Sequence, residues 1–353
     1  MLFDVLVIGA GQAGLAAAYH LGRSPNSFVV LDGSARVGDS WRRRYACLTL
    51  FTPRRFSSLP GLEMPGDPEG YADRDEFAAY LEDYARHWKL PVQTETRVVE
   101  LSREAGGLFA ATTRDGRVLR ARSIIVATGA FMEPAPPPIA KDFDPAIIQL
   151  DVTKYQAPDG VPPGTALVVG DGASGRDIAM ELAPTRRTLL ASGKPRRLLP
   201  ESLLGRNVWW WLSRLGLMTA GANSLVGRVM RRADPFPSRG RAAEDLGRAG
   251  VKLRPRLVGA KGQHAVFADG RTEQVQAIIW ATGYRDRFDW LEIDGALSAV
   301  GSPMQTAGIS VVPGLFFLGR AWQRNRASSL IMGAGEDASI VVYHALTFAT
   351  RQA

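Results

Sequence analysis

Short runs of apolar residues recur along the chain and predict its main strands. Several of these runs are continuous rather than alternating, which is typical of parallel strands that are buried on both faces. The clearest runs are Val5 to Ile8, Phe28 to Leu31, Ile124 to Ala127, Ala166 to Val169, Thr188 to Ala191, Ile278 to Trp280 and Leu315 to Leu318.

Helical patterns lie between some of these runs. Gly14 to Gly22 follows the first run, and Arg176 to Leu182 follows the fourth. A third pattern spans residues 74–88 and is amphipathic. Its apolar side consists of Phe77, Tyr80, Leu81 and Tyr84. Strands that alternate with helices predict the α/β class.

Two segments rich in proline and glycine, residues 133–139 and 159–164, interrupt this pattern and mark a crossing between domains. The order of strand, glycine turn and helix restarts at Ala166, as a crude repeat of the first forty residues. We therefore predict two Rossmann-like domains. The first is discontinuous and comprises residues 1–157 and 285–353, and the second is residues 158–284 inserted between them.

The first glycine turn, Gly9-Ala10-Gly11-Gln12-Ala13-Gly14, has the pattern G-x-G-x-x-G between a strand and a helix. In such a turn the glycines allow a tight bend, a close approach to a pyrophosphate, and close packing of helix on strand. The helix N-terminus adds free N–H groups and partial positive charge. Asp32 ends the next strand, where an acid can accept hydrogen bonds from ribose.

The second glycine turn, Gly170-Asp171-Gly172-Ala173-Ser174-Gly175, repeats the pattern. The strand after it ends in Ser192, and no Asp or Glu lies between Glu181 and Glu201. The cations that follow are Lys194, Arg196 and Arg197. Because a cation accommodates the 2′-phosphate, we predict NADPH, with NADH as the alternative if these side chains are simply solvated.

Two fingerprints imply two dinucleotides, and the natural pairing is FAD with the nicotinamide that reduces it. We assign FAD to the discontinuous domain and NAD(P) to the inserted domain. Two further turns at strand ends, Ala127-Thr128-Gly129 and Ala281-Thr282-Gly283, place a small residue and a glycine where the chain can pass close to a cofactor.

Composition narrows the alternatives without changing this picture. A chain of 353 residues suits about two domains. The net charge of +8 comes from dispersed basic residues, and the sequence contains no recognised nucleic-acid-binding module, so we expect no nucleic-acid partner.

The single cysteine, Cys47, excludes an intrachain disulfide framework and favours a packing role. The four histidines show no metal-ligand spacing, so we expect no metal. The sequence shows no signal peptide and no spanning segment, so we expect a cytoplasmic protein.

These motifs resemble the class B flavin-containing monooxygenases, and more closely their short bacterial CzcO-like relatives, over nearly the whole chain. The segment 37–41 matches the family's turn beside the flavin, and residues 45–53 resemble the segment that passes the isoalloxazine. Residues 281–284 match the family's ATGY motif, and residues 313–319 resemble its returning strand.

The resemblance implies further FAD contacts and an activity. The contacts it implies, beyond the first fingerprint, are Gly38, Ser40, Trp41, Leu48, Thr128, Gly129, Gly319, Gln323, Arg326 and Asp337; those for NAD(P) include Ser192, Thr282 and Gly283. It implies that NADPH reduces FAD, which then reacts with O2 to oxygenate a small sulfide, amine or ketone. The flavin-side candidates for a catalytic role are Phe51, Gln323 and Asp151.

Three departures from the family leave a second class of function open. Asp151 stands at the position of a family histidine when the motif is matched on Tyr155, Phe51 replaces a frequent asparagine, and Gly193 a frequent arginine. An NAD(P)H oxidase or reductase is therefore one alternative, and a redox-sensing accessory flavoprotein is another. The sequence leaves the oligomeric state open between monomer and homodimer.

The segment 207–218 contains three consecutive tryptophans, Trp209, Trp210 and Trp211. Packing between domains is the interpretation that we favour. Contact with substrate comes second, and contact with a membrane, suggested by the flanking Arg206 and Arg214, comes last.

Overall fold

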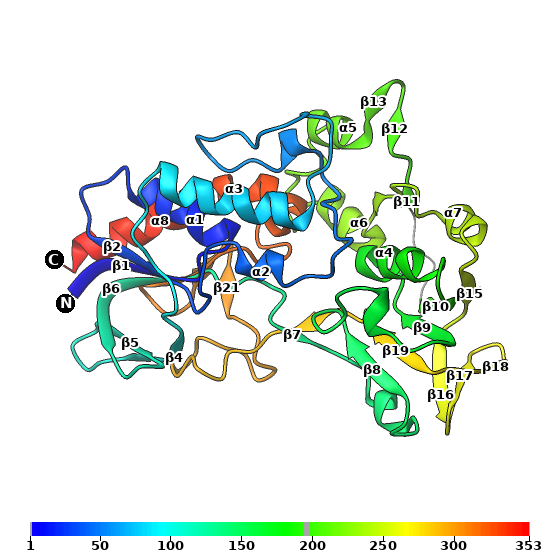
Figure 1. The fold of residues 1–353 in the computed structure, drawn as a ribbon. Coiled ribbons are helices and arrows are strands. Elements are labelled where there is room, and N and C mark those ends of the chain that lie inside the picture. The colour runs from blue at the N-terminus through cyan, green and yellow to red at the C-terminus, as the bar shows by residue number, and fades with distance from the viewer. Residues whose placement is uncertain (1, 194–197, 353) are drawn as a thin grey trace.

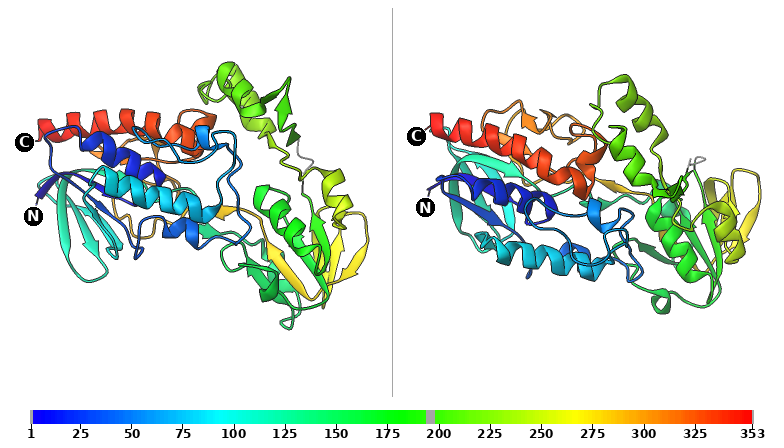
Figure 2. Two further views of the ribbon diagram at one scale, coloured as in Figure 1. Left: turned by 45° about the horizontal axis from the view of Figure 1, so that its top comes forward. Right: turned by 90° about the horizontal axis from the view of Figure 1, so that it is seen from above.

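The computed structural model describes residues 2–193 and 198–352, which form two lobes side by side (Figure 1). The first lobe contains both ends of the chain, and the second is built from its middle (Figures 1 and 2). Each lobe has a largely parallel sheet with helices on one face, so the predicted α/β class is confirmed.

The sheet of the first lobe has the order β21-β22-β23-β6-β1-β2-β3, with β5 and β4 continuing from β6. Its parallel strands are β1 (Leu2–Ile8), β2 (Phe28–Leu31), β3 (Val92–Gln93), β6 (Val118–Val126) and β23 (Leu315–Phe317). The antiparallel strands are β4 (Val98–Arg103), β5 (Phe109–Thr113), β21 (Gln305–Thr306) and β22 (Ile309–Ser310).

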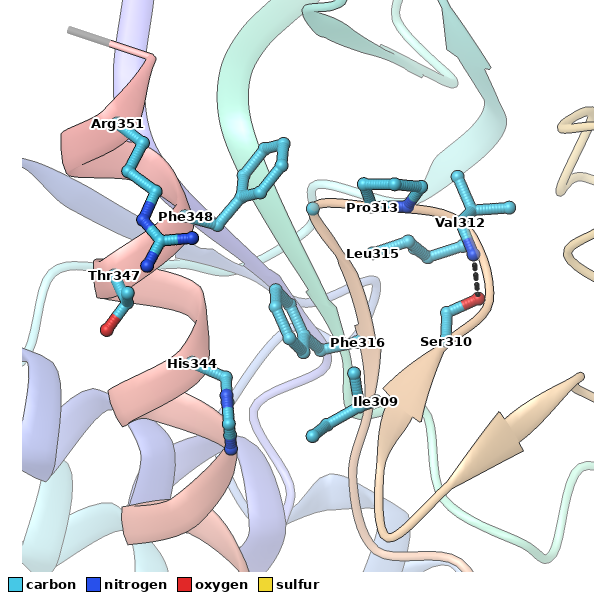
Figure 3. A pocket seen from close by; sticks show the side chains of 11 residues that line it. Ile309, Ser310, Val312, Pro313, Leu315, Phe316, His344, Thr347, Phe348 and Arg351 are labelled. Atoms are coloured by element: carbon cyan, nitrogen blue, oxygen red, sulfur yellow. Dashed lines mark hydrogen bonds between the residues drawn. The ribbon is translucent and has the colours of Figure 1, made fainter.

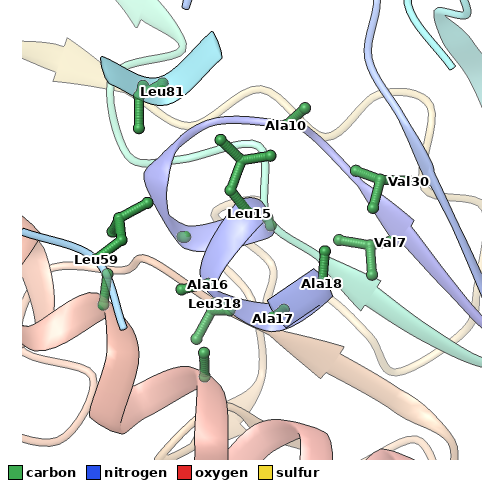
Figure 4. Packing of buried hydrophobic residues seen from close by; sticks show 14 of the residues in the cluster. Val7, Ala10, Leu15, Ala16, Ala17, Ala18, Val30, Leu59, Leu81 and Leu318 are labelled. Carbon is green, nitrogen blue, oxygen red and sulfur yellow. The ribbon is translucent and has the colours of Figure 1, made fainter. Parts of the chain in front are cut away.

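Three helices cover one face of this sheet: α1 (Gln12–Leu21), α3 (Arg74–His87) and α8 (Ile331–Arg351). Figure 4 shows the core beneath them, where Val7 and Val30 of the sheet meet alanines of α1 and Leu318. Leu6 and Val29 point to the opposite face, because side chains alternate along a strand. Both faces are therefore apolar, as the continuous runs predicted.

The predicted helix at residues 74–88 is confirmed as α3, which buries Phe77, Tyr80, Leu81 and Tyr84. The Asp73 carboxylate accepts hydrogen bonds from the N–H groups of Asp75 and Glu76, each at 2.8 Å. The Glu76 carboxylate in turn accepts from the N–H of Asp73 at 2.9 Å. This capping box fixes where the helix begins.

The sheet of the second lobe has the order β15-β10-β9-β19-β8, and all its strands are parallel. The strands are β8 (Ile148–Asp151), β9 (Thr165–Val169), β10 (Arg187–Ala191), β15 (Lys252–Arg254) and β19 (Ala277–Trp280). One face carries α4 (Ala173–Leu182) and α7 (Ala243–Arg248). The other carries the antiparallel strands β16 (Leu257–Lys261), β17 (His264–Phe267) and β18 (Thr272–Gln274).

An excursion between β10 and β15 leaves the second sheet. It contains β11 (Leu198–Leu199), β12 (Ser202–Leu203), β13 (Arg206–Asn207), α5 (Val208–Arg214), α6 (Leu225–Ala233) and β14 (Phe236–Pro237). Figure 2 shows that α5 and its hairpin project from the body of the protein.

The two crossings between the lobes run beside each other. Here β7 (Glu133–Pro134) pairs with β20 (Tyr284–Arg285) in antiparallel fashion. The domain limits at 157/158 and 284/285 stay a prediction. Strand β8 lies before the first of these limits, yet it pairs with β19 of the second sheet.

Short helices complete the chain: α2 (Asp39–Arg42), and the 3-10 turns η1 (Arg54–Phe56), η2 (Pro138–Asp142), η3 (Pro158–Gly160) and η4 (Arg326–Ser329). Among the described residues, no helix combines the length and apolar character that crossing a membrane requires.

Candidate cofactor sites

The first fingerprint forms a tight junction between β1, α1 and the end of β6. Gly9 has a φ of 107°, and a Cβ there would lie 2.6 Å from the Ala127 carbonyl oxygen. A Cβ on Gly14 would lie 1.8 Å from the Gly9 carbonyl oxygen. These two glycines are required because no side chain has room where helix and strands converge.

Gly11 differs from these two, because an added Cβ there would meet nothing within 4 Å. It is the N-cap residue of α1, and no side chain caps the helix there. The first turn, which begins with Gln12 and Ala13, therefore has N–H groups without an acceptor inside the helix. That arrangement is suited to a pyrophosphate, as the fingerprint predicted.

Asp32 lies beside this turn at the end of β2. Its Oδ2 accepts a hydrogen bond from the Ala10 N–H at 2.7 Å, and its Oδ1 accepts from the Ser34 N–H at 2.7 Å. Each carboxylate oxygen has a second lone pair left for a ribose hydroxyl. The two backbone contacts fix the position of the carboxylate before any cofactor binds.

The second fingerprint repeats the geometry of the first. Gly170 has a φ of 108°, and a Cβ there would lie 2.3 Å from the Ala281 carbonyl oxygen. A Cβ on Gly175 would lie 1.8 Å from the Gly170 carbonyl oxygen. Gly172 is the N-cap of α4, again with no side-chain cap, followed by Ala173 and Ser174. Ala281 thus packs in this lobe as Ala127 packs in the first.

Beside the second fingerprint, at the end of β10, lies a buried network that the sequence alone did not indicate. The Ser192 hydroxyl donates to Asp171 Oδ2 at 2.9 Å, and Arg176 Nη2 lies 3.3 Å from the same oxygen. Arg176 Nε also donates to the Asp171 carbonyl at 3.0 Å. The sequence analysis assigned no role to Asp171, which occupies a variable position of the motif. The only local signal of a role was the presence of an acid between two glycines.

The predicted phosphate-binding cations Lys194, Arg196 and Arg197 lie outside the described residues. Thr282 and Gly283 follow β19 after Ala281, and the Thr282 hydroxyl donates to the Ala135 carbonyl at 2.8 Å. Residues 282 and 283 therefore lie next to the crossing between the lobes, at the same sheet edge as the second fingerprint.

The turn before α2 lies close to the first fingerprint. Gly38 is the N-cap of α2, which contains Ser40 and Trp41. The Trp41 indole N–H donates to Gln12 Oε1 at 3.3 Å, and its ring packs edge-on against Phe77. This contact places the turn predicted to flank the flavin beside the N-terminus of α1.

Three buried polar atoms have no hydrogen-bond partner at residues that the resemblance assigned to FAD: Thr128 Oγ1, Gln323 Nε2 and Asp337 Oδ2. Buried polar groups are normally paired, so orphaned ones call for an explanation. Burial also raises the pKa of Asp337, whose Oδ1 accepts from Arg324 Nη1 at 2.9 Å. The set fits a polar cofactor that supplies the missing partners.

The other residues assigned to FAD are more scattered. Gly319 lies against Ala13, since its added Cβ would be 2.9 Å from the alanine Cβ, and Gly129 directly follows Thr128. Leu48 packs instead against the core of the second lobe. Arg326 is buried and pairs with Asp234 of the excursion at 3.4 Å. Its contact with FAD stays a prediction.

Phe51 lies beneath the excursion. Its ring stacks on Trp209 with 6.0 Å between ring centroids, and its carbonyl accepts a hydrogen bond from the Trp209 indole at 2.8 Å. Trp209 is almost fully buried, which agrees with the packing interpretation of the tryptophan segment. Trp210 and Trp211 are only partly buried.

Asp151 ends β8 and caps the turn that follows. Its Oδ1 accepts hydrogen bonds from the N–H groups of Thr153 at 2.8 Å and Lys154 at 3.2 Å. Tyr155 is fully buried and donates to Glu181 Oε2 at 2.7 Å. These contacts explain the two side chains structurally, and a catalytic role for Asp151 stays a prediction.

Helix α4 is joined to the first lobe by a buried cluster of charged groups. Arg239 Nη2 donates to both oxygens of Asp177, at 3.1 and 2.9 Å, while Arg239 Nη1 donates to the Thr49 carbonyl at 2.9 Å. Nearby, burial raises the pKa of Cys47, so its thiol stays protonated and is a poor nucleophile. The segment predicted to pass the flavin is thus held against the helix of the second fingerprint.

One cavity of about 200 Å³ lies elsewhere, around the start of β23 (Figure 3). His344 and Phe348 of α8 face Ile309 and Phe316 across it. The fingerprint lies at the carboxyl end of the parallel strands, so this cavity is at the opposite edge of the sheet. None of the predicted site residues lines it.

Comparison with known proteins agrees with this geometry. Residues 6–195 match the family model of the pyridine nucleotide-disulphide oxidoreductases. An uncharacterized CzcO-like oxidoreductase of Geobacillus kaustophilus is 40% identical over 97% of both chains. A flavin-containing monooxygenase structure from Stenotrophomonas maltophilia has a TM-score of 0.82 and 28% identity, covering 98% of this chain and 99% of its own. Rice indole-3-pyruvate monooxygenase YUCCA1 is 30% identical, covering 87% and 82%.

Two dinucleotide sites on one chain and these likenesses define an oxidoreductase that depends on a flavin and a pyridine nucleotide. The chain belongs to the pyridine nucleotide-disulphide oxidoreductase family and, within it, groups with the CzcO-like oxidoreductases. This membership confirms the predicted cofactors, FAD and NADPH.

Proposed function

We propose that this protein is a monooxygenase that uses NADPH, FAD and O2 to oxygenate a small soft nucleophile, such as a sulfide or amine, or a ketone. The carrying observation is the pair of equivalent fingerprints, whose lobes are joined by Arg239 at the segment leading to Phe51. The full-length likeness to a flavin-containing monooxygenase supports the same reaction class. We place the enzyme in the cytoplasm, where NADPH is supplied.

Each of the two lobes would bind one of the two cofactors. The N-terminus of α1, with Gly11 and Asp32, would hold the pyrophosphate and ribose of FAD, and the N-terminus of α4 would hold those of NADPH. FAD reduced by NADPH supplies the chemistry that activates O2. The stacked rings of Phe51 and Trp209 would shield one side of the flavin from water, which such chemistry requires.

A disulfide reductase is a poor alternative, because the sequence contains only Cys47 and therefore no CxxC pair. An NADPH oxidase or reductase is the stronger alternative function. It is favoured by the engagement of Asp151 and Tyr155 in turn and packing contacts, which gives both side chains a structural role.

Turnover with isotopically labelled O2 separates these two functions. A monooxygenase consumes one NADPH and one O2 per product, places one labelled oxygen in the sulfoxide, N-oxide or ester, and releases the other as water. We would test a sulfide, a tertiary amine and a cyclic ketone. Unlabelled substrate together with stoichiometric hydrogen peroxide would reject the proposal in favour of an oxidase.

The variant Gly175→Ala tests, in the same assay, whether electrons enter through the second fingerprint. Its Cβ would fall 1.8 Å from the Gly170 carbonyl oxygen and distort only the second fingerprint. We expect it to retain FAD and lose NADPH-driven oxygenation. Product formation at the wild-type rate would show that the second site is not the entry point of electrons.

A further inference from the structure

The excursion between β10 and β15 carries an exposed apolar surface. Six large apolar side chains that are exposed lie between residues 203 and 229, namely Leu203, Leu204, Leu215, Leu225, Val226 and Val229. Leu204, at the hairpin tip, is 82% exposed, and Leu225 is 75% exposed. Scattered exposed apolar residues are normal, but such a concentration in one projecting segment indicates an interaction site.

The core of the protein does not need these side chains. The inward side of the excursion packs Trp209 and Leu212 of α5 and Met230 of α6 against a cluster with Ala327 and Leu330. The Trp211 indole donates to the Leu203 carbonyl at 2.8 Å, which ties the hairpin to α5. Both helices are therefore held from within, and their outward apolar residues are left without a partner among the described residues.

The same segment is strongly basic. It contains Arg206, Arg214, Arg228, Arg231 and Arg232, and Glu201 is its only acid between residues 198 and 233. No ion pair is formed by any of these five arginines within the part of the chain that the structure describes. Arg206 instead lies over the Trp210 ring at 5.3 Å. The charges are thus available to an anionic partner.

Helix α6 shows how charge and apolar surface are combined. Leu225 and Val229 are four residues apart and share one side of the helix, while Arg228, Arg231 and Arg232 share the adjoining side. Only Gly227 of this helix is buried. A short helix whose apolar side is exposed beside a row of arginines has the character of a helix that lies in a membrane interface.

We propose that the outer surface of residues 203–232 docks on an anionic lipid bilayer. The leucines would enter the boundary between headgroups and acyl chains, and the arginines would bind lipid phosphates. Trp210 and Trp211 suit the same boundary, because their rings are apolar and their N–H groups are polar. The inference is independent of the oxygenated substrate and departs from the packing interpretation of the sequence, which accounts for Trp209 alone.

The test is co-sedimentation of the FAD-loaded protein with two kinds of vesicle, one of phosphatidylcholine and one of phosphatidylcholine mixed with phosphatidylglycerol. We expect binding only to the anionic vesicles, weakening as salt is raised above about 0.1 M. Failure to bind anionic vesicles at low salt would overturn the proposal. Equal binding to both kinds would overturn its electrostatic part.

Two sets of variants locate the contact. The triple variant Arg228→Gln, Arg231→Gln, Arg232→Gln should weaken binding about 100-fold, at roughly a factor of five for each charge near the surface. The triple variant Leu204→Ser, Leu225→Ser, Val229→Ser should weaken it at least about tenfold. Each has a control with three comparable changes at exposed positions elsewhere. These controls are Arg86→Gln, Arg114→Gln, Arg287→Gln and Val258→Ser, Val300→Ser, Val311→Ser.

Equal losses in a test variant and its control would overturn the assignment to this surface. Bound flavin absorbance and the unfolding temperature check that each variant is folded. Sedimentation velocity without lipid distinguishes the remaining occupant, a second copy of the chain. Self-association that the same variants abolish, with no binding to vesicles, would replace the membrane with a homodimer.

Discussion

At the scale of single residues, the fingerprint glycines differ in why they are needed. Gly14 and Gly175 each sit where a Cβ would lie 1.8 Å from a backbone oxygen, whereas Gly11 faces open space. The first kind is required by packing within the chain. The second is required by the approach of a ligand, so a substitution at Gly11 should affect binding more than folding.

The variant Gly14→Ala should therefore lose FAD and stability together. The methyl group cannot fit without moving α1 from β1, and overpacking of this kind costs about 1–3 kcal/mol. Gly247→Ala is the matched control, because Gly247 is also helical but an added Cβ meets nothing within 4 Å. There we expect a gain of about 0.5–1 kcal/mol. Flavin content and urea unfolding of both variants provide the measurement.

Lys194 and Arg196 come shortly after β10, which ends at Ala191, and were predicted to bind the 2′-phosphate of NADPH. Removing both, as Lys194→Ala with Arg196→Ala, should raise the KM for NADPH about tenfold or more, because hydrogen bonds to charged groups contribute about 1.5–3 kcal/mol. The KM for NADH should stay nearly unchanged. Equal changes for both nucleotides in steady-state kinetics would refute the assignment.

At the scale of elements, charged side chains connect strands that are not paired by backbone hydrogen bonds. Glu273 of β18 accepts a hydrogen bond from Arg187 of β10 at 2.7 Å and pairs with Arg254 of β15. It thus ties the antiparallel layer of the second lobe to its parallel sheet. The hydrogen bond from Arg254 is the main cause that lowers the pKa of Glu273 below its ordinary value.

This pairing predicts a pH-dependent contribution to stability. A carboxyl group whose pKa is lowered by folding stabilises the folded state above its unfolded pKa, and that contribution is lost as pH falls through the folded pKa. Glu273→Gln should cost about 1 kcal/mol near neutral pH, discounted for partial solvent exposure. The difference from wild type should shrink below about pH 4.3. Urea unfolding across this range would contradict us if the difference stayed constant.

At the scale of the whole molecule, the function depends on how the two lobes are held together. Arg239 bonds to Asp177 of the second lobe and to the Thr49 and Leu50 carbonyls of the first. Arg44 reinforces the junction, since its guanidinium donates to the Tyr284 hydroxyl at 2.5 Å beside the paired strands β7 and β20. Hydride transfer between two bound cofactors requires that such contacts fix their relative position.

Arg239→Met should slow the reduction of bound flavin by NADPH about tenfold or more, because it releases the segment at residues 49–50 from α4 and leaves the buried Asp177 short of a partner. Chemical reduction of the flavin by dithionite should be unaffected. Stopped-flow absorbance measures both reactions. A parallel slowing with dithionite would indicate general damage rather than lost alignment, and Arg248→Met, at an exposed ion pair on α7, serves as the control.

The sequence by itself determined the elements and the two dinucleotide turns. Continuous apolar runs predicted the central strands of both sheets. A strand that is buried on both faces has apolar residues at successive positions, and this pattern is visible locally. The fingerprints were equally readable, because the steric needs of Gly9 and Gly14 arise within a few residues and the strand before them.

Only the tertiary structure decided what distant residues do to one another. The pairing of Asp171 with Ser192, the joining of Asp177 to residues 49–50 through Arg239, and the burial of Trp209 on Phe51 all link positions far apart in sequence. Long-range contacts leave no local periodicity to read. The exposure of the leucines between residues 203 and 229 likewise depends on which neighbours pack against them, so the apolar residues alone could not show that they lie at the surface.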